Sequence, residues 1–217
     1  MPNYPIDPDI RRAETLPGQF YHDAEVYATL REQLFARSWQ WIGVDEAVPG
    51  PNRAFPFTLL PGLLDEPLML SRDAEGQIRC LSNVCTHRGN ILVRKAGACN
   101  VLRCGYHGRR FGMDGSMEHM PGFEDAEDFP GFSDHLPQLE LGGLAQFLFT
   151  ALRPMCTFEA WLEGLSERIG WLPMGEFRLG SPRTRTFNLK AHWALYVGTY
   201  LEGFHLPFVH KGLTAAL

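Results

Sequence analysis

Two short strings of metal-binding residue types constrain the fold of this chain more than any other feature. Cys85-Thr-His87-Arg-Gly and Cys104-Gly-Tyr-His107-Gly each offer one thiolate and one imidazole from a glycine-containing loop, and sixteen residues separate His87 from Cys104. Two thiolates and two imidazoles can hold two irons if both cysteines bind one iron and both histidines bind the other. The two strings therefore predict one metal centre held between two loops.

This donor set is that of a Rieske [2Fe-2S] cluster, whose potential exceeds that of all-cysteine clusters because neutral imidazoles replace two anionic ligands. The alternative is a structural zinc site, since zinc also accepts two sulfurs and two nitrogens. Zinc-finger spacing usually pairs cysteine with cysteine and histidine with histidine, whereas here each loop supplies one of each. An orange-brown colour and the EPR signal of a two-iron cluster would distinguish iron from zinc.

The composition limits the partners and the compartment. The 217 residues carry a net charge of −5, which argues against nucleic acid as a partner. The start at Met1 lacks the pattern of a signal peptide, and the apolar stretch over residues 142–152 is too short to span a bilayer. We therefore expect a cytoplasmic protein whose remaining cysteines, Cys80, Cys99 and Cys156, are reduced and mostly buried.

The pattern along the chain predicts three segments. Residues 1–38 should form an arm and a helix that begins at Asp23. Residues 39–155 should form a mostly β domain with its metal loops on hairpins. Residues 156–217 should begin an α+β domain, with a helix over 158–169, a strand over 183–189 and a helix over 192–204. The strands expected in the β domain cover residues 39–44, 54–60, 67–71, 77–83, 101–104, 110–113 and 144–152, and residues 118–134 should be an acidic surface loop.

The last predicted helix carries a second candidate metal motif. Its apolar residues between Trp193 and Phe204 form a single stripe, which predicts packing into a core. Glu202 and His205 lie off this stripe, about 60° apart on the same side, and Pro207 should turn the chain so that His210 returns toward His205. Two histidines and a carboxylate with open positions suit a non-haem iron(II) that binds oxygen. The alternative is two ordinary helix-end histidines beside an exposed glutamate.

Together these motifs resemble the catalytic α subunit of Rieske non-haem iron oxygenases, the ring-hydroxylating oxygenase family. The resemblance extends from Phe35-Ala-Arg-Ser-Trp39 to His210. It implies a Rieske domain over residues 39–155, followed over 156–217 by the beginning of a mononuclear-iron catalytic domain that is truncated at its C-terminus. It assigns the cluster ligands as Cys85, His87, Cys104 and His107, and two ligands of the mononuclear iron as His205 and His210.

The resemblance also implies a reaction and partners. A ferredoxin or flavin reductase would supply electrons from NAD(P)H to the cluster, for O2-dependent hydroxylation of a small organic substrate by one or two oxygen atoms. Glu202 matches the acidic residue that links a cluster histidine of one subunit to an iron-ligand histidine of the next. His107 of one protomer would thus approach Glu202 and His205 of its neighbour, which implies a homotrimer. An aromatic substrate is expected, with aryl carboxylates and small quaternary amines left open.

The sequence departs from the family pattern at two places. The family's carboxylate iron ligand lies far downstream, so we expect this chain to be the N-terminal part of a longer protein, unless Glu202 replaces that ligand. Arg109 stands where a tryptophan commonly follows the second loop. Two alternatives remain: a Rieske ferredoxin-like electron carrier, which would leave His205 and His210 unexplained, and an inactive truncated relative.

The charge around the cluster strings suggests where an electron donor docks. Residues 88–110 contain six basic side chains and no acidic one, although the whole chain is negative. Such a patch would attract an acidic ferredoxin-like partner. The alternative is that these charges only balance an anionic cluster and its surroundings. The six residues are Arg88, Arg94, Lys95, Arg103, Arg109 and Arg110.

Overall fold

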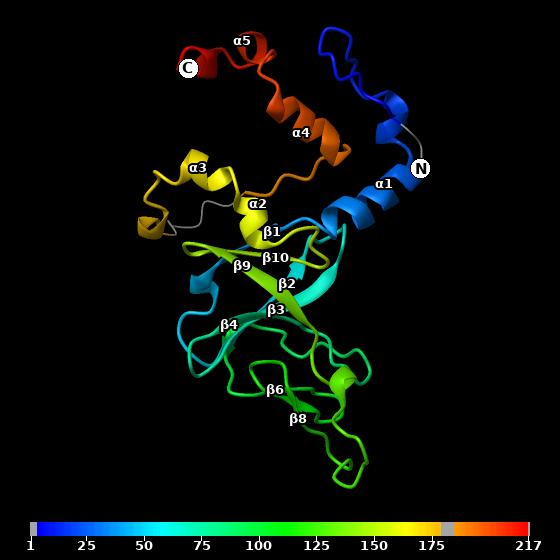
Figure 1. Ribbon diagram of the computed structural model, residues 1–217, viewed down its shortest axis with the longest axis vertical. Coiled ribbons are helices and arrows are strands. Elements are labelled where there is room, and N and C mark those ends of the chain that lie inside the picture. The colour runs from blue at the N-terminus through cyan, green and yellow to red at the C-terminus, as the bar shows by residue number, and fades with distance from the viewer. Residues whose placement is uncertain (1–3, 179–184, 217) are drawn as a thin grey trace. The chain divides into compact units, whose positions relative to one another are not determined.

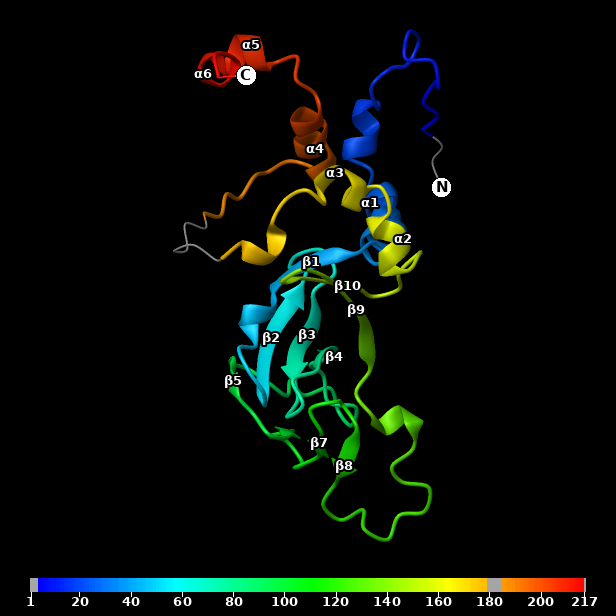
Figure 2. The ribbon, with the colours of Figure 1, turned by 60° about the vertical axis from the view of Figure 1, so that its left-hand side comes forward.

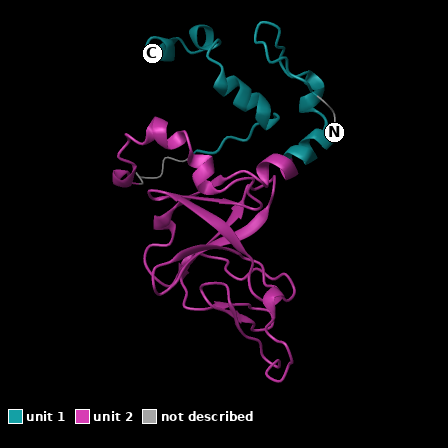
Figure 3. Cartoon of the chain, viewed as in Figure 1, with its two compact units in different colours: residues 1–30, 179–217 teal, residues 31–178 magenta. Residues whose placement is uncertain are grey.

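The computed structural model describes residues 4–178 and 185–216, which form two compact units. The larger unit contains residues 31–178, and the smaller unit combines residues 1–30 with residues 179–217 (Figure 3). The helices are α1 (Ala24–Leu30), α2 (Phe158–Leu162), α3 (Leu165–Ile169), α4 (Trp193–Leu201), α5 (Leu206–Val209) and α6 (Lys211–Thr214), and a π-helical turn, η2 (Arg31–Phe35), follows α1.

The larger unit is built from two antiparallel sheets (Figures 1 and 2). Both views place the smaller sheet at the opposite end of this unit from α2. The larger sheet has the order β1 (Gln40–Val44), β10 (Phe147–Ala151), β9 (Gln138–Leu144), β4 (Ile78–Ser82), β3 (Glu66–Arg72), β2 (Arg53–Leu59) and β5 (Gly97–Ala98). The smaller sheet has the order β6 (Leu102–Arg103), β7 (Arg110–Phe111) and β8 (Met117–His119).

Turn chemistry accounts for the short connections. Between β3 and β4, Gly76 has a φ of +88°, and the Asp73 carboxylate accepts the backbone N–H of Gln77 at 2.8 Å. Between β7 and β8, Gly115 has a φ of +87° and follows Asp114, whose carboxylate accepts the N–H of Ser116. Glycine adopts such left-handed conformations without steric cost. In both turns an aspartate and a glycine, residue types typical of tight turns, stand where the chain reverses its direction.

One hydrophobic core joins the two sheets and contains the candidate cluster cysteines. Met69 and Leu81 enter it from the larger sheet, and the fully buried Phe111 enters it from the smaller sheet. Cys85 and Cys104 belong to the same cluster, each with only 2% of its surface exposed. Because the core packs directly against both cysteines, it positions the backbone of the two metal loops.

The structure corrects several predicted elements. The helix predicted over 158–169 is divided into α2 and α3, because Gly164 adopts a left-handed φ of +67° between them. Residues 185–189 form no strand, and the first two residues of the strand predicted over 183–189 lie outside the described residues. The last predicted helix ends at Leu201 rather than 204. β9 over Gln138–Leu144 was not predicted as a strand.

In the smaller unit, side-chain caps define two helices. The Asp23 carboxylate accepts the N–H groups of Glu25 and Val26 at 2.8 and 3.2 Å, so α1 begins where the sequence predicts. His192 caps α4 by accepting the Ala194 N–H at its Nδ1. The His192 ring also packs edge-on against three aromatic rings from the first 30 residues, those of Phe20, Tyr21 and Tyr27.

The prediction that the apolar stripe of α4 is buried is wrong for the described structure. Tyr196, Tyr200 and Leu201 are exposed by 64%, 82% and 77%. The contact of His192 with the aromatic rings holds the start of this helix, whereas the described residues of the unit leave the stripe uncovered.

All five cysteines are free thiols. Cys80 is buried in β4, and this burial raises the pKa of its thiol to about 12, so it stays protonated at neutral pH. Cys99 is half-buried, whereas Cys156 is exposed, contrary to the expectation of mostly buried thiols. No helix among the described residues combines the length and the apolar character needed to cross a bilayer.

Candidate metal centres

The two predicted metal loops have the same backbone architecture. The first follows β4 and is closed by a bridge between Val84 and Ile91. The second joins β6 to β7 and is closed by the pair Arg103 and Arg110. In both cases six residues separate the paired positions, and the cysteine comes directly after the first of them. The two loops are therefore equivalent hairpin tips, although their histidines stand at different spacings from the cysteines.

The internal hydrogen bonds of the two loops are also equivalent. Each cysteine N–H donates to the carbonyl five residues later, at 2.8 Å in both loops. The glycine four residues after each cysteine donates its N–H to the cysteine carbonyl, at 3.0 Å for Gly89 and 3.1 Å for Gly108. These glycines have φ values of +69° and +78°, a region that L-residues with a Cβ disfavour. The glycine in each string is thus a requirement of the turn.

These loops bring the four candidate ligands together as a sulfur pair and an imidazole pair. The thiols of Cys85 and Cys104 interact with each other without forming a disulfide. The rings of His87 and His107 lie with their centroids 4.8 Å apart. A Rieske cluster needs this distribution, because one iron takes two cysteines and the other takes two histidines. The donor set present therefore fits the [2Fe-2S] group.

The electrostatics favour a thiolate at Cys104 and a neutral imidazole at His87, whereas burial favours the protonated thiol at Cys85. Burial raises the pKa of the Cys85 thiol. At Cys104 burial acts in the same direction, but N–H groups that donate to the sulfur outweigh it, so the pKa of this thiol is lowered. These donors include the Tyr106 backbone at 3.4 Å and the Asn90 side chain at 3.6 Å from Sγ. At His87, desolvation first and the nearby cations second lower the pKa. An imidazole must be neutral to bind a metal through its ring nitrogen.

The basic patch predicted around the loops is smaller than the sequence indicates. Arg109 is buried and donates to Asp134 at 2.9 Å, so it is unavailable to a docking partner. The five remaining basic residues of the patch are exposed: Arg88, Arg94, Lys95, Arg103 and Arg110. The structure also shows that Asp134 and Met120, at the two ends of the predicted acidic surface loop, contact the Arg109 side chain.

The second motif lies in the smaller unit, at the end of α4. Glu202 is the residue that ends this helix, with extended backbone angles, so it does not share a helical face with His205 as predicted. A turn brings the two side chains together instead, and a Glu202 carboxylate oxygen is hydrogen-bonded to His205 Nδ1. This contact with His205 lowers the pKa of Glu202. Because Nδ1 is engaged, Nε2 is the ring nitrogen of His205 that remains for a metal.

His210 returns to His205 as the sequence predicts. α5 begins with Pro207 in its first turn, and the N–H of His210 donates to the Leu206 carbonyl at 2.9 Å. The two histidine rings lie with their centroids 5.2 Å apart. Within the described residues, no three His, Cys, Asp or Glu side chains meet as the ligands of a single metal ion. The motif therefore offers two adjacent imidazoles, with Glu202 as the partner of one of them.

A cavity of about 410 Å³ opens beside this histidine pair. Its wall contains His205, His210 and Glu202 together with two aromatic rings, those of Tyr196 and Tyr200. Two adjacent imidazoles, one carboxylate and two aromatic rings thus face one space large enough for a small organic molecule.

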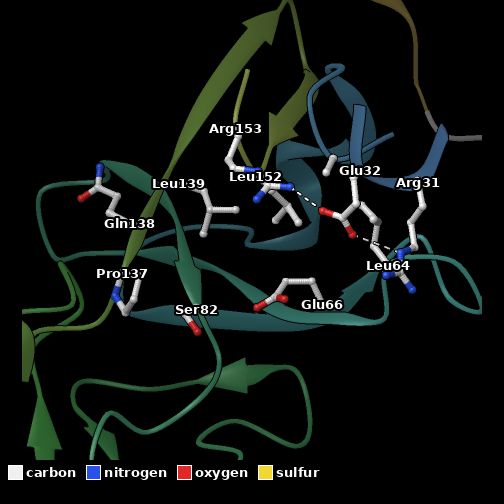
Figure 4. Close-up of a pocket in the computed structure, with 11 residues that line it drawn as sticks. Arg31, Glu32, Leu64, Glu66, Ser82, Pro137, Gln138, Leu139, Leu152 and Arg153 are labelled. Carbon is white, nitrogen blue, oxygen red and sulfur yellow. Dashed lines mark hydrogen bonds and ion pairs between the residues drawn. The ribbon is translucent and has the colours of Figure 1, made fainter. Parts of the chain in front are cut away.

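A different groove lies in the larger unit, lined by eleven residues from η2 and the strands around β9 (Figure 4). Glu32 stands at its edge between Arg31 and Arg153 and accepts hydrogen bonds from both, at 3.1 and 2.7 Å. None of its lining residues is a histidine or a cysteine. The groove therefore contributes no ligand to either candidate centre.

Comparison with known proteins identifies the class that this fold and these loops define. Residues 38–130 match the Rieske [2Fe-2S] domain family. This segment contains all four candidate cluster ligands and both of the equivalent hairpin loops. The larger unit therefore contains a Rieske domain, and the cofactor of such a domain is a [2Fe-2S] cluster.

Beyond that domain, nearly the whole chain resembles the α subunits of Rieske non-haem iron oxygenases. It is 28% identical over 206 residues to the carnitine monooxygenase oxygenase subunit of Escherichia coli (strain K12), covering 94% of this chain and 54% of that protein. It is 27% identical over 217 residues to the chloroplastic choline monooxygenase of Spinacia oleracea, covering 95% and 48%. The chain thus spans about half the length of these relatives.

The fold supports the same resemblance. The structure matches the crystal structure of the quaternary ammonium Rieske monooxygenase CntA in complex with its substrate gamma-butyrobetaine. The TM-score is 0.76 and the sequences are 27% identical, with 92% of this chain and 57% of that chain covered. The match covers more of this chain than residues 38–130 alone.

The sequence did not predict a role for Thr86 or Asp134. Thr86 lies between two candidate ligands, yet threonine is not a ligand type, and Asp134 stands 25 residues from Arg109, with which it pairs. The available signal was Arg109 itself, which stands where a tryptophan commonly follows the second loop. A buried guanidinium requires acceptors, but the sequence does not say which ones.

Proposed function

We propose that this chain supplies the cluster-binding and iron-binding residues of a Rieske oxygenase that oxidises a quaternary ammonium compound with O2. The observation that carries this proposal is the presence, in one chain, of the sulfur and imidazole pairs of the Rieske loops and of the adjacent His205 and His210 rings. Cys85 and Cys104 would bind one iron of the cluster, and His87 and His107 the other. A bound cluster supplies single electrons, and an iron(II) at the second site reacts with O2.

The remaining residues of the second motif have supporting roles in this proposal. Glu202 holds the ring of His205 through Nδ1 and so directs Nε2 toward the metal. We do not assign Glu202 as the carboxylate ligand, since its carboxylate is already engaged by His205 and by the Phe204 N–H.

The exposed side of the candidate cluster site supports a proposal about assembly and electron supply. His107 is exposed, and the ring of Tyr106 packs against it at a tilt of 34°, with the ring centroids 3.8 Å apart. A neighbouring protomer can therefore reach the imidazole pair, and we propose a homotrimer in which His107 of one protomer meets Glu202 of the next. The exposed basic residues around the loops would receive an acidic ferredoxin or flavin reductase.

The relatives favour a quaternary ammonium substrate over the aromatic one expected from the sequence. Carnitine and choline monooxygenases are named for quaternary ammonium compounds. The cavity beside His205 presents Tyr196 and Tyr200 together with the carboxylate of Glu202. Tyrosine faces and a carboxylate both attract a trimethylammonium group, which has no N–H to donate.

Reconstitution of the full chain with iron and sulfide tests the proposal. The wild type should bind about three irons, two of them with acid-labile sulfide. His210→Ala should lose about one iron and keep the visible spectrum of the cluster. With photoreduced flavin as the electron source, carnitine or choline should give an oxidised product and naphthalene none.

Two outcomes would contradict the proposal. About two irons in both wild type and His210→Ala would indicate an electron carrier without a catalytic iron. A product from naphthalene and none from either quaternary amine would restore the aromatic substrate.

A further inference from the structure

Arg109 occupies an unusual position for an arginine. It ends the second metal loop, where its backbone carbonyl accepts the N–H of Cys104 at 2.8 Å. Its side chain turns inward, so that only 4% of it is exposed. Removing a guanidinium from water is costly unless its N–H groups find acceptors inside the protein. The contacts of Arg109 therefore show what the buried charge is used for.

The Arg109 side chain joins three segments that are distant in sequence. Its Nη1 donates to Thr86 Oγ1 at 2.7 Å, and its Nη2 donates to Asp134 Oδ1 at 2.9 Å. Its Nε lies 3.3 Å from Met120 Sδ, and its guanidinium carbon lies 5.6 Å from the centre of the Phe129 ring. The second metal loop is thereby tied to the first loop and to the segment that precedes β9.

The hydroxyl of Thr86 closes this network. Thr86 Oγ1 accepts from Arg109 and donates to the Asp134 backbone carbonyl at 2.7 Å. The other carboxylate oxygen of Asp134 accepts the N–H of Gly131 at 2.9 Å. The polar side-chain atoms of Arg109, Thr86 and Asp134 thus all have partners. Such a network fixes the geometry of its members more strongly than separate contacts would.

The location of Thr86 gives this network its importance. Thr86 stands between Cys85 and His87, the two candidate ligands of the first loop, and Arg109 stands two residues after His107 in the second loop. No disulfide connects the loops. Besides the contact between the two cysteine thiols, Asn90 reaches from the first loop to Cys104 Sγ at 3.6 Å. The Arg109–Thr86 hydrogen bond, at 2.7 Å, is shorter than the Asn90 contact and does not involve a candidate ligand atom.

We propose that Arg109 is a positioning residue for the cluster: through Thr86 and Asp134 it holds the two ligand loops in register before and after the cluster binds. The inference rests on the assignment of Cys85, His87, Cys104 and His107 as the cluster ligands. An apolar side chain could fill the same space, but it could not join the loops. The network thus orients the ligands from outside the coordination sphere, as hydrogen-bonding partners of metal ligands do in other metal sites.

Thr86→Val tests the proposal with the smallest change, because it removes the hydroxyl and leaves the ion pair between Arg109 and Asp134 intact. Transfer of iron from the reconstituted full chain to an iron(II) chelator, and the EPR g values of the reduced cluster, are the two readouts. We expect iron loss on the order of tenfold faster than in the wild type, with shifted g values. Thr86→Ser, which keeps the hydroxyl, should restore both.

Arg109→Met and Arg110→Met complete the design. Arg110 follows Arg109 in sequence, but its side chain is exposed, so Arg110→Met is a matched control that should behave as the wild type. Arg109→Met should accelerate iron loss at least as much as Thr86→Val. Adding Thr86→Val to Arg109→Met should have little further effect, because both changes remove the same hydrogen bond. Should Arg109→Met fail to fold, the comparison of Thr86→Val with Thr86→Ser decides the question alone.

The result that overturns the inference is wild-type iron retention and wild-type g values in Thr86→Val. Equal acceleration in Thr86→Val and Arg110→Met would overturn it as well, since any change near the loops would then suffice. A wild-type chain that binds no cluster would instead refute the ligand assignment itself, and the inference with it. The failure of the inference alone is therefore distinguishable from the failure of the proposed function.

Discussion

The equivalent glycines of the two metal loops allow a quantitative test of the local structure. Gly108 has a φ of +78°, and for an L-residue this left-handed region costs roughly 1–2 kcal/mol. An added Cβ would lie 3.3 Å from Pro121 Cγ, which is a tight contact with a rigid ring. Gly89 has a φ of +69°, but its Cβ would meet nothing within 4 Å. Gly89→Ala should therefore lose about 1–2 kcal/mol of stability, and Gly108→Ala at least as much.

Gly105 provides the matched control within the same loop. Its φ lies outside the left-handed range, and a Cβ there would meet nothing within 4 Å. Replacing such a glycine by alanine restricts the unfolded chain without straining the folded one. We therefore expect Gly105→Ala to change the free energy of unfolding by less than about 1 kcal/mol, in the stabilising direction.

Thermal unfolding of the metal-free chain, followed by circular dichroism, measures these differences. In a chain of this size 1 kcal/mol corresponds to a shift of about 2–4 °C, so Gly89→Ala should lower the melting temperature by roughly 2–8 °C. Working without metal separates the cost of the backbone from any change in cluster affinity. Equal losses in Gly105→Ala and Gly108→Ala would refute the reasoning, because the cost would then not depend on the handedness of the backbone.

Three further predictions concern charge, pH and packing. Replacing both Arg94 and Lys95 by Glu should slow reduction by an acidic donor at low salt, measured by stopped-flow absorbance; unchanged kinetics would exclude docking at this patch. Burial first, and nearby His22 second, lower the pKa of His192 from 6.5. As the pH falls below about 6.5, His192 is therefore protonated in the unfolded chain before it is protonated in the folded one, and the smaller unit loses stability. His192→Asn, which can still cap α4, should flatten this pH dependence of stability in circular dichroism, and an unaltered profile would assign the dependence to other groups. A Cβ at Gly142 would come within 2.3 Å of the Phe158 ring, so Gly142→Ala should lower the urea stability by about 1–3 kcal/mol, and a neutral effect would show that α2 shifts freely.

Much of the fold could be predicted because local chemistry determines it. Asp23 caps α1, and the glycines at 76 and 115 form tight turns, since a short side chain or a missing Cβ acts within a few residues. β9 escaped prediction because Gly142 and Gly143 weaken its strand pattern, and its pairing with β4 and β10 depends on partners that lie elsewhere in the chain. The helix predicted over 158–169 failed because one left-handed glycine, Gly164, divides it.

In the candidate site, too, some features could be predicted from local sequence and others could not. Cysteine, histidine and glycine at these spacings predict two metal loops from the sequence alone, because metal ligands and left-handed turns require particular residue types. The contact of Glu202 with His205 was also predicted, although a turn and not a helical face produces it. The sequence placed Arg109 in an exposed basic patch, whereas the structure shows that its side chain is buried.

What the amino-acid sequence determined by itself is the chemistry available in each loop: which atoms can bind iron, and where the backbone must turn. Only the tertiary structure decided which residues hold those loops together, with Arg109 meeting Thr86 across 23 residues and Asp134 across 25. The physical reason is the separation along the chain over which each property is determined. Ligand type and turn geometry are properties of a few consecutive residues, whereas the partner of a buried charge is chosen by the packing of the whole domain.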